Sequence, residues 1–169
     1  NGNVSSSYLT AVGTEALKSN TSGTNNTAVG NSALGGVTTN GDNTALGINA
    51  GGVGNILQTV SIGSGANFSL SYGANSYNVA VGYQAAYSTT GARYNTSGVA
   101  IGWRAGYQGG GNRGIGIGYG ALNSTTGADN IVIGANAQVM STSSNSQLVL
   151  GSGSSQNRWL ISDVASTRR

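Results

Sequence analysis

A short motif recurs nine times along the chain, and no other feature of the sequence restricts the fold as strongly. Each copy places a central, usually small residue between two larger ones and ends in glycine, as in Val79-Ala80-Val81-Gly82. Successive copies are 16 to 20 residues apart, and alanine stands three residues after every final glycine except the last, where Ser154 stands. Self-similarity at a nearly fixed period is typical of repeat architectures. We call the final glycines the anchor glycines: Gly13, Gly30, Gly47, Gly63, Gly82, Gly102, Gly118, Gly134 and Gly151.

The chemistry of one repeat predicts one coil of a β-solenoid. A small residue between two β-branched residues indicates a short strand, and the glycine that follows allows the chain to turn. One repeat accommodates two strands of about five residues and two turns, and such coils stack at roughly 4.8 Å. We therefore predict an all-β, parallel β-roll of about nine coils. It forms a single repeat domain over residues 1–169, of which residues 154–169 are a C-terminal exit segment.

The two faces of the predicted strand differ in size, which leaves two arrangements open. The residue before each anchor glycine is Val, Leu or Ile, whereas the central residue is usually Ala. We expect the large residues, Ile101 among them, to fill a dry interior. The small face then allows a neighbouring chain to approach closely near a symmetry axis, as glycine does in collagen. In the alternative, the small residues meet the second wall of the same roll. We expect an oligomer rather than a monomer.

Composition argues against catalysis and metal binding. The chain has no His and no Cys, and its acids are Glu15, Asp42, Asp129 and Asp163. Asp42 and Asp129 share a position in the repeat but lie five coils apart, about 24 Å at the strand spacing, too far to act as a catalytic pair. Serines and threonines are abundant but have no histidine as a base. We predict no enzyme activity, no catalytic residue, no metal site and no cofactor, and we set aside a solenoid polysaccharide lyase or hydrolase.

The sparse charges also argue against two kinds of partner. The net charge of +3 comes from seven scattered Lys and Arg residues, whereas nucleic-acid binding requires a dense basic surface. No apolar run approaches the roughly 18 residues of a membrane-spanning helix. We expect neither a nucleic-acid partner nor membrane insertion.

Aromatic residues gather between residues 68 and 119 and repeat in register. Some follow an anchor glycine directly, others stand five residues after one, and two arginines stand eleven after one. Stacked coils place such matches in ladders, and Trp, Tyr and Arg often dominate binding surfaces. The alternative is that these side chains only pack against one another or between chains. The candidate receptor contacts are Tyr83, Trp103, Tyr119, Tyr87, Tyr107, Arg93 and Arg113.

The motif also resembles known repeats. Units such as Val99-Ala100-Ile101-Gly102 are similar to the head repeats of YadA-type trimeric autotransporter adhesins. Asn26-Thr27-Ala28-Val29-Gly30 resembles, more closely still, related β-roll repeats of bacteriophage tail fibres, in which such repeats often precede an endosialidase-type intramolecular chaperone. The segment 157–163 resembles the lead-in to that chaperone. The resemblance covers about residues 8–153 and implies a left-handed parallel β-roll that forms a homotrimer.

The resemblance gives the function that we expect. It implies a structural and adhesive segment of an extracellular trimeric fibre, most closely a phage tail fibre on the virion surface that attaches to a glycan or protein receptor of the host. Alternatives are the head of a bacterial trimeric autotransporter adhesin on the cell surface and a self-assembling extracellular filament.

Overall fold

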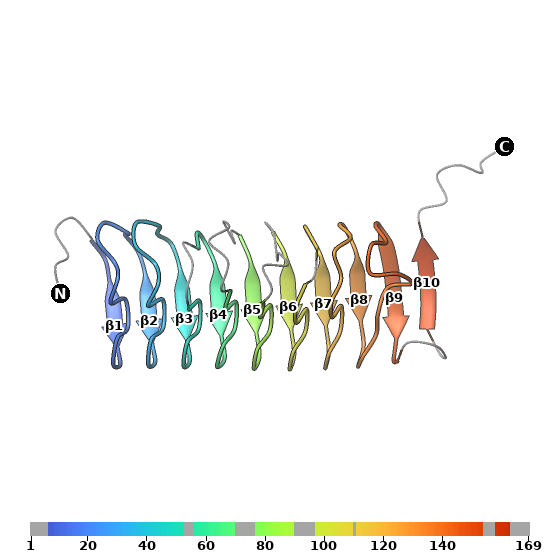
Figure 1. The fold of residues 1–169 in the computed structure, drawn as a ribbon, viewed down its shortest axis with the longest axis horizontal. Coiled ribbons are helices and arrows are strands. Elements are labelled where there is room, and N and C mark those ends of the chain that lie inside the picture. Colours follow the sequence, from blue (N-terminus) through green and yellow to red (C-terminus); the bar gives the residue numbers. More distant parts are fainter. Residues whose placement is uncertain are drawn as a thin grey trace.

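The computed structural model describes residues 7–52, 56–69, 77–89, 97–109 and 111–153 in full and the backbone of residues 158–162. Within these residues, ten strands follow one another in a single sheet in the order of the sequence (Figure 1). No helix occurs in these ranges. The strands are β1 (Thr10–Val12), β2 (Thr27–Val29), β3 (Thr44–Leu46), β4 (Val60–Ile62), β5 (Val79–Val81), β6 (Val99–Ile101), β7 (Ile115–Ile117), β8 (Ile131–Ile133), β9 (Gln147–Gly151) and β10 (Arg158–Ser162).

The nine motif copies coincide with β1 to β9, which pair in parallel and in register. Ala80 of β5 pairs with Ala100 of β6, for example, and Ile101 of β6 with Ile117 of β7. Each strand is therefore one turn of the chain away from the next, which confirms the predicted all-β solenoid. Within the predicted exit segment, β10 reverses direction and pairs antiparallel with β9. The predicted left-handed winding and the three-chain assembly stay predictions.

The anchor glycines stand where neighbouring coils lie too close together to leave room for a side chain. Gly102 has a φ of 131°, a value that residues with a side chain rarely adopt. A Cβ added there would lie 2.5 Å from the carbonyl oxygen of Gly118 in the next coil. Glycine is required at this position both for the backbone conformation and for the spacing of the coils.

The second wall of the roll is not the second strand that we predicted. After each anchor glycine the chain passes through left-handed residues, such as Glu15 and Leu17 with φ of 59° and 52°. Their N–H groups bond to neighbouring coils: Leu17 donates to the carbonyl of Ala33 at 3.0 Å, and Ser32 donates to that of Thr14 at 2.8 Å. Turn conformations thus replace an extended strand while the backbone groups of the wall are still paired between coils.

The structure also reverses the expected inside and outside of the strands. The central residues Ala28, Ala45 and Ala80 are completely buried in the roll. The residues before the anchor glycines point outward, and Ile101 is 38% exposed. Our prediction that Ile101 fills a dry interior is therefore wrong for a single chain, and the small face meets the second wall of its own roll.

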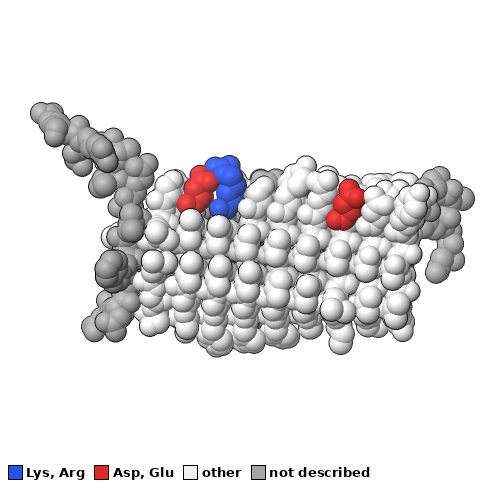
Figure 2. Space-filling model, turned by 180° about the vertical axis from the view of Figure 1, so that it is seen from behind, with Lys and Arg blue, Asp and Glu red and all other residues white. Residues whose placement is uncertain are grey.

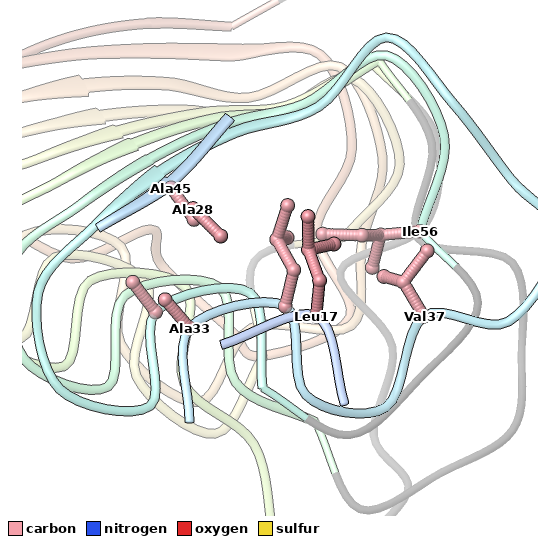
Figure 3. Close-up of a cluster of buried hydrophobic side chains, with 8 residues drawn as sticks. Leu17, Ala28, Ala33, Val37, Ala45 and Ile56 are labelled. Carbon is pink, nitrogen blue, oxygen red and sulfur yellow. The ribbon is translucent and has the colours of Figure 1, made fainter. Parts of the chain in front are cut away.

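Around β2 and β3, the interior is filled from the second wall and from the loops rather than from the strands. Close to Ala28 and Ala45, the space is occupied by Leu17, Val37 and Ile56 (Figure 3). These larger side chains leave only the volume of a methyl group beneath the strand, which explains the alanine in its centre. In the cluster near β8, the strands themselves contribute Val132 and Val149 beside Leu122 and Val139. The middle cluster consists entirely of alanines.

Candidate functional site

Three aromatic residues that directly follow anchor glycines form a column along the roll, which we call the first aromatic column: Tyr83, Trp103 and Tyr119. The register of β5, β6 and β7 places these positions one above another. The ring centroids of Tyr83 and Trp103 lie 6.2 Å apart, and those of Trp103 and Tyr119 lie 4.6 Å apart and within 5° of parallel. The three side chains are 46%, 39% and 51% exposed. The rings stack as the repeat predicts, and they lie at the surface.

A second aromatic column runs along the second wall, five residues after each anchor glycine: Phe68, Tyr87 and Tyr107. The centroid of Tyr87 lies 5.1 Å from that of Phe68 and 5.5 Å from that of Tyr107, and the rings are nearly parallel. All three side chains are half-buried. Tyr87 and Tyr107 were among the predicted residues, whereas Phe68 was not, although its distance from Gly63 is the same.

Arg104 connects the two columns. Its guanidinium carbon lies 4.7 Å from the ring centroid of Trp103 and 4.4 Å from that of Tyr107. Its Nε also donates a hydrogen bond of 2.9 Å to Oε1 of Gln84 in the preceding coil. Sequence reasoning missed Arg104, because it sought arginines that recur in register. The available signal was its place between two aromatic positions of one coil.

Arg113 pairs with Asp129 of the next coil. Its Nε and its terminal nitrogen lie 2.5 and 2.7 Å from the two carboxylate oxygens. The hydrogen bonds from Arg113 hold the pKa of the Asp129 carboxyl below its ordinary value, and the same bonds raise the pKa of Arg113. Arg113 therefore links two coils. Arg93, which we predicted as its counterpart, lies outside the described residues.

The stacked geometry determines what the aromatic surface offers to a ligand. A ring between two others presents its edge to solvent, because its faces are covered by its neighbours. The first column thus displays ring edges, phenol hydroxyls and an indole, with the Arg104 guanidinium beside them. Stacked pairs also contribute about 0.5–1.5 kcal/mol each beyond burial of area. The middle coils, whose buried hydrophobic cluster consists of alanines, are the ones that carry these columns.

The acidic residues that the structure describes do not form a cluster. Asp42 accepts a hydrogen bond of 2.9 Å from Nδ2 of Asn25 in the preceding coil, and Asp129 is bound by Arg113. Among the described residues, no three His, Cys, Asp or Glu side chains lie close enough together to hold a metal ion. No helix long and apolar enough to cross a membrane occurs in the described part of the chain.

Searches against protein-family profiles, curated proteins and solved structures found no match to this chain.

Proposed function

We propose that the chain is a structural and adhesive segment of an extracellular trimeric fibre, with a bacteriophage tail fibre as the setting that its repeats resemble most closely. The observation that carries this proposal is an apolar face on the outside of β1 to β9. We call it the strand face, and it consists of the two outward-pointing positions of each motif.

The strand face is continuous because the strands pair in register. Ile62, Val81, Ile101, Ile117 and Ile133 follow one another along one edge of it. Nine strands at the spacing of a sheet extend for about 40 Å. Its positions contain only Val, Ile, Leu and Thr. In Figure 2, the charged side chains in view lie along one edge, and the rest of the described surface in that view is uncharged. Contiguous exposed apolar surface of this extent marks an interaction site.

Copies of the same chain are the partner that this face fits best. When copies stand parallel around an axis along the solenoid, each Ile101 meets its equivalents, and every coil contributes the same contact. Such an arrangement closes on itself, as most homo-oligomers do. We infer that three copies surround the axis, because the Val-Ala-Ile-Gly units resemble the repeats of trimeric fibres. The large side chains that we expected inside one roll then form a core between three.

Attachment is assigned to the other side of the roll. The second aromatic column lies on the second wall, next to buried residues such as Ala86 that point into the roll. This wall stays at the outside of the assembly when the strand faces are buried against one another. A trimer presents each aromatic surface three times, so that weak single contacts add up on a polyvalent host surface.

Cross-linking tests the assembly, because the chain has no cysteine of its own. Ile101→Cys places one thiol on each strand face, and Met140→Cys places a control thiol on a turn, where the side chain is well exposed. A short bis-maleimide is expected to link Ile101→Cys chains in pairs. Conversion is expected to stop at about two-thirds, because the third thiol around a threefold axis has no partner. Equal cross-linking of the two variants contradicts the proposal, and complete conversion of Ile101→Cys indicates an even number of chains, such as a dimer.

A further inference from the structure

A groove opens on the second wall at one end of the second aromatic column. Its volume is about 510 Å³, within the range of small-molecule sites. It extends over coils on the β1 side of Phe68. The residues that line it include Lys18, Ser32, Gly35, Asn49, Gly52 and Phe68.

The groove exists because two positions of the column lack a side chain. Gly35 and Gly52 stand five residues after their anchor glycines, where later coils carry the rings of Phe68, Tyr87 and Tyr107. Phe68 stacks on Tyr87 and leans over Gly52, where an added Cβ would lie 2.4 Å from its Cδ2. Beyond the ring of Phe68, the bottom of the groove therefore consists of backbone without side chains. A flat ligand ring placed there continues the aromatic column.

The polar groups around the groove form hydrogen bonds without adding net charge. Nζ of Lys18 lies 2.9 Å from Oε2 of Glu15, and the hydroxyl of Ser32 donates to the same oxygen at 3.2 Å. The hydrogen bond from Lys18, followed by that from Ser32, lowers the pKa of Glu15, so the carboxylate stays ionised and balances the ammonium. Lys18, Ser32 and Asn49 offer donors and acceptors at the rim.

We propose that this groove binds a neutral saccharide. A pyranose ring has an apolar C–H face that suits the ring of Phe68, and its hydroxyls both donate and accept, as the amide of Asn49 and the hydroxyl of Ser32 do. An acidic sugar gains little binding free energy from Lys18, because the carboxylate of Glu15 already neutralises the ammonium group of that lysine. This inference deepens the proposed attachment role and rests on it. In the trimer the groove lies outside the strand faces and is present three times.

The first test uses the unaltered chain. An NMR titration with neutral hexose and N-acetylhexosamine oligosaccharides, including lactose and diacetylchitobiose, is expected to shift the amide signals of Gly35, Gly36 and Gly52. Sialyllactose serves as the acidic counterpart of lactose and is expected to bind no better. The proposal is overturned if no neutral oligosaccharide shifts these signals, if the acidic sugar binds more tightly, or if shifts appear only at other residues.

Two variants test the groove from opposite directions. Gly35→Phe fills it with a ring at a column position that carries rings in later coils, and Phe68→Ala removes its wall. Each is expected to weaken saccharide binding at least about tenfold, the loss of roughly 1.4 kcal/mol. Asn123→Ala is the control, because Asn123 occupies the same column position beyond Tyr107. Unchanged binding in both groove variants refutes the site. The trimer mass, measured on the same samples, shows separately whether the fibre proposal holds.

Discussion

The Oδ1 atom of Asn26 accepts two hydrogen bonds from Asn43 in the next coil, one from its backbone N–H at 3.1 Å and one from its Nδ2 at 3.0 Å. Oδ1 of Asn43 in turn accepts from the N–H and the hydroxyl of Thr59, at 3.1 and 3.0 Å. All three side chains are buried. Two side-chain amides and a hydroxyl thus connect three coils from the inside, just before β2, β3 and β4 begin.

Asn43→Ala is expected to destabilise the fold by about 3 kcal/mol, because it leaves buried partners of Asn43 unsatisfied at roughly 1–3 kcal/mol per group. Asn31→Ala, at an exposed position of the preceding coil, is the control and is expected to change stability by less than about 0.5 kcal/mol. Thermal unfolding at one fixed chain concentration measures both variants. Similar losses of stability in the two variants would show that the buried hydrogen bonds of Asn43 contribute no more than an exposed position does.

Close approach of the coils predicts that anchor glycines tolerate no side chain. In Gly102→Ala, the added Cβ lies 2.5 Å from the carbonyl oxygen of Gly118 and sits at an unfavourable φ. Gly153→Ala is the matched control, since Gly153 also has a positive φ but no atom within 4 Å of its added Cβ. Backbone strain of this kind costs about 1–3 kcal/mol, so Gly102→Ala is expected to lose more than its control. Equal melting temperatures would contradict the crowding.

The strand positions, the parallel register and the aromatic columns could be predicted from the sequence, because the glycine and alanine positions align the coils. The direction of the strand faces could not. Alternation separates Ala100 from Ile101 but does not say which of them points inward. That depends on how much of the interior the second wall fills, and Leu34 and Leu122 fill it from turns whose left-handed residues have no strong sequence signal. Arg104 was missed for the related reason that its contacts join two different columns.

The stacked rings predict that the first aromatic column also stabilises the middle coils. Trp103→Ala removes two ring pairs and the contact with Arg104. This substitution is expected to lower stability by about 1–3 kcal/mol, at roughly 0.5–1.5 kcal/mol per ring pair. Trp103→Phe keeps a ring in the column and is expected to retain most of this stabilisation. Attachment to host cells, measured in parallel, tests the receptor role. A loss of attachment in Trp103→Phe, at unchanged melting temperature, identifies receptor contact rather than packing.

The ion pair between Arg113 and Asp129 predicts a pH dependence. The pKa of Asp129 is lowered in the folded chain by the hydrogen bonds from Arg113. The pair therefore stabilises the fold at pH values above the ordinary pKa of the carboxyl, and this contribution is lost as the pH falls through the lowered value. Asp129→Asn is expected to lower the melting temperature at neutral pH, with the difference closing in acid. In an Arg113→Gln background the same substitution is expected to have little effect at any pH. A difference that persists in acid would refute this.

The oligomeric state tests the central claim, that the strand face is buried between three copies of the chain. Light scattering is expected to give three times the chain mass of 16.7 kDa. Ile101→Asp places three carboxylates together at the axis, and because Ile101 is 38% exposed in one chain, the roll itself tolerates the charge. This variant is expected to scatter as a single chain with the far-ultraviolet circular dichroism of the unaltered protein, whereas Met140→Asp remains trimeric. A folded, unaltered chain with a mass of 16.7 kDa, or an Ile101→Asp variant that keeps its full trimer mass, would contradict the account.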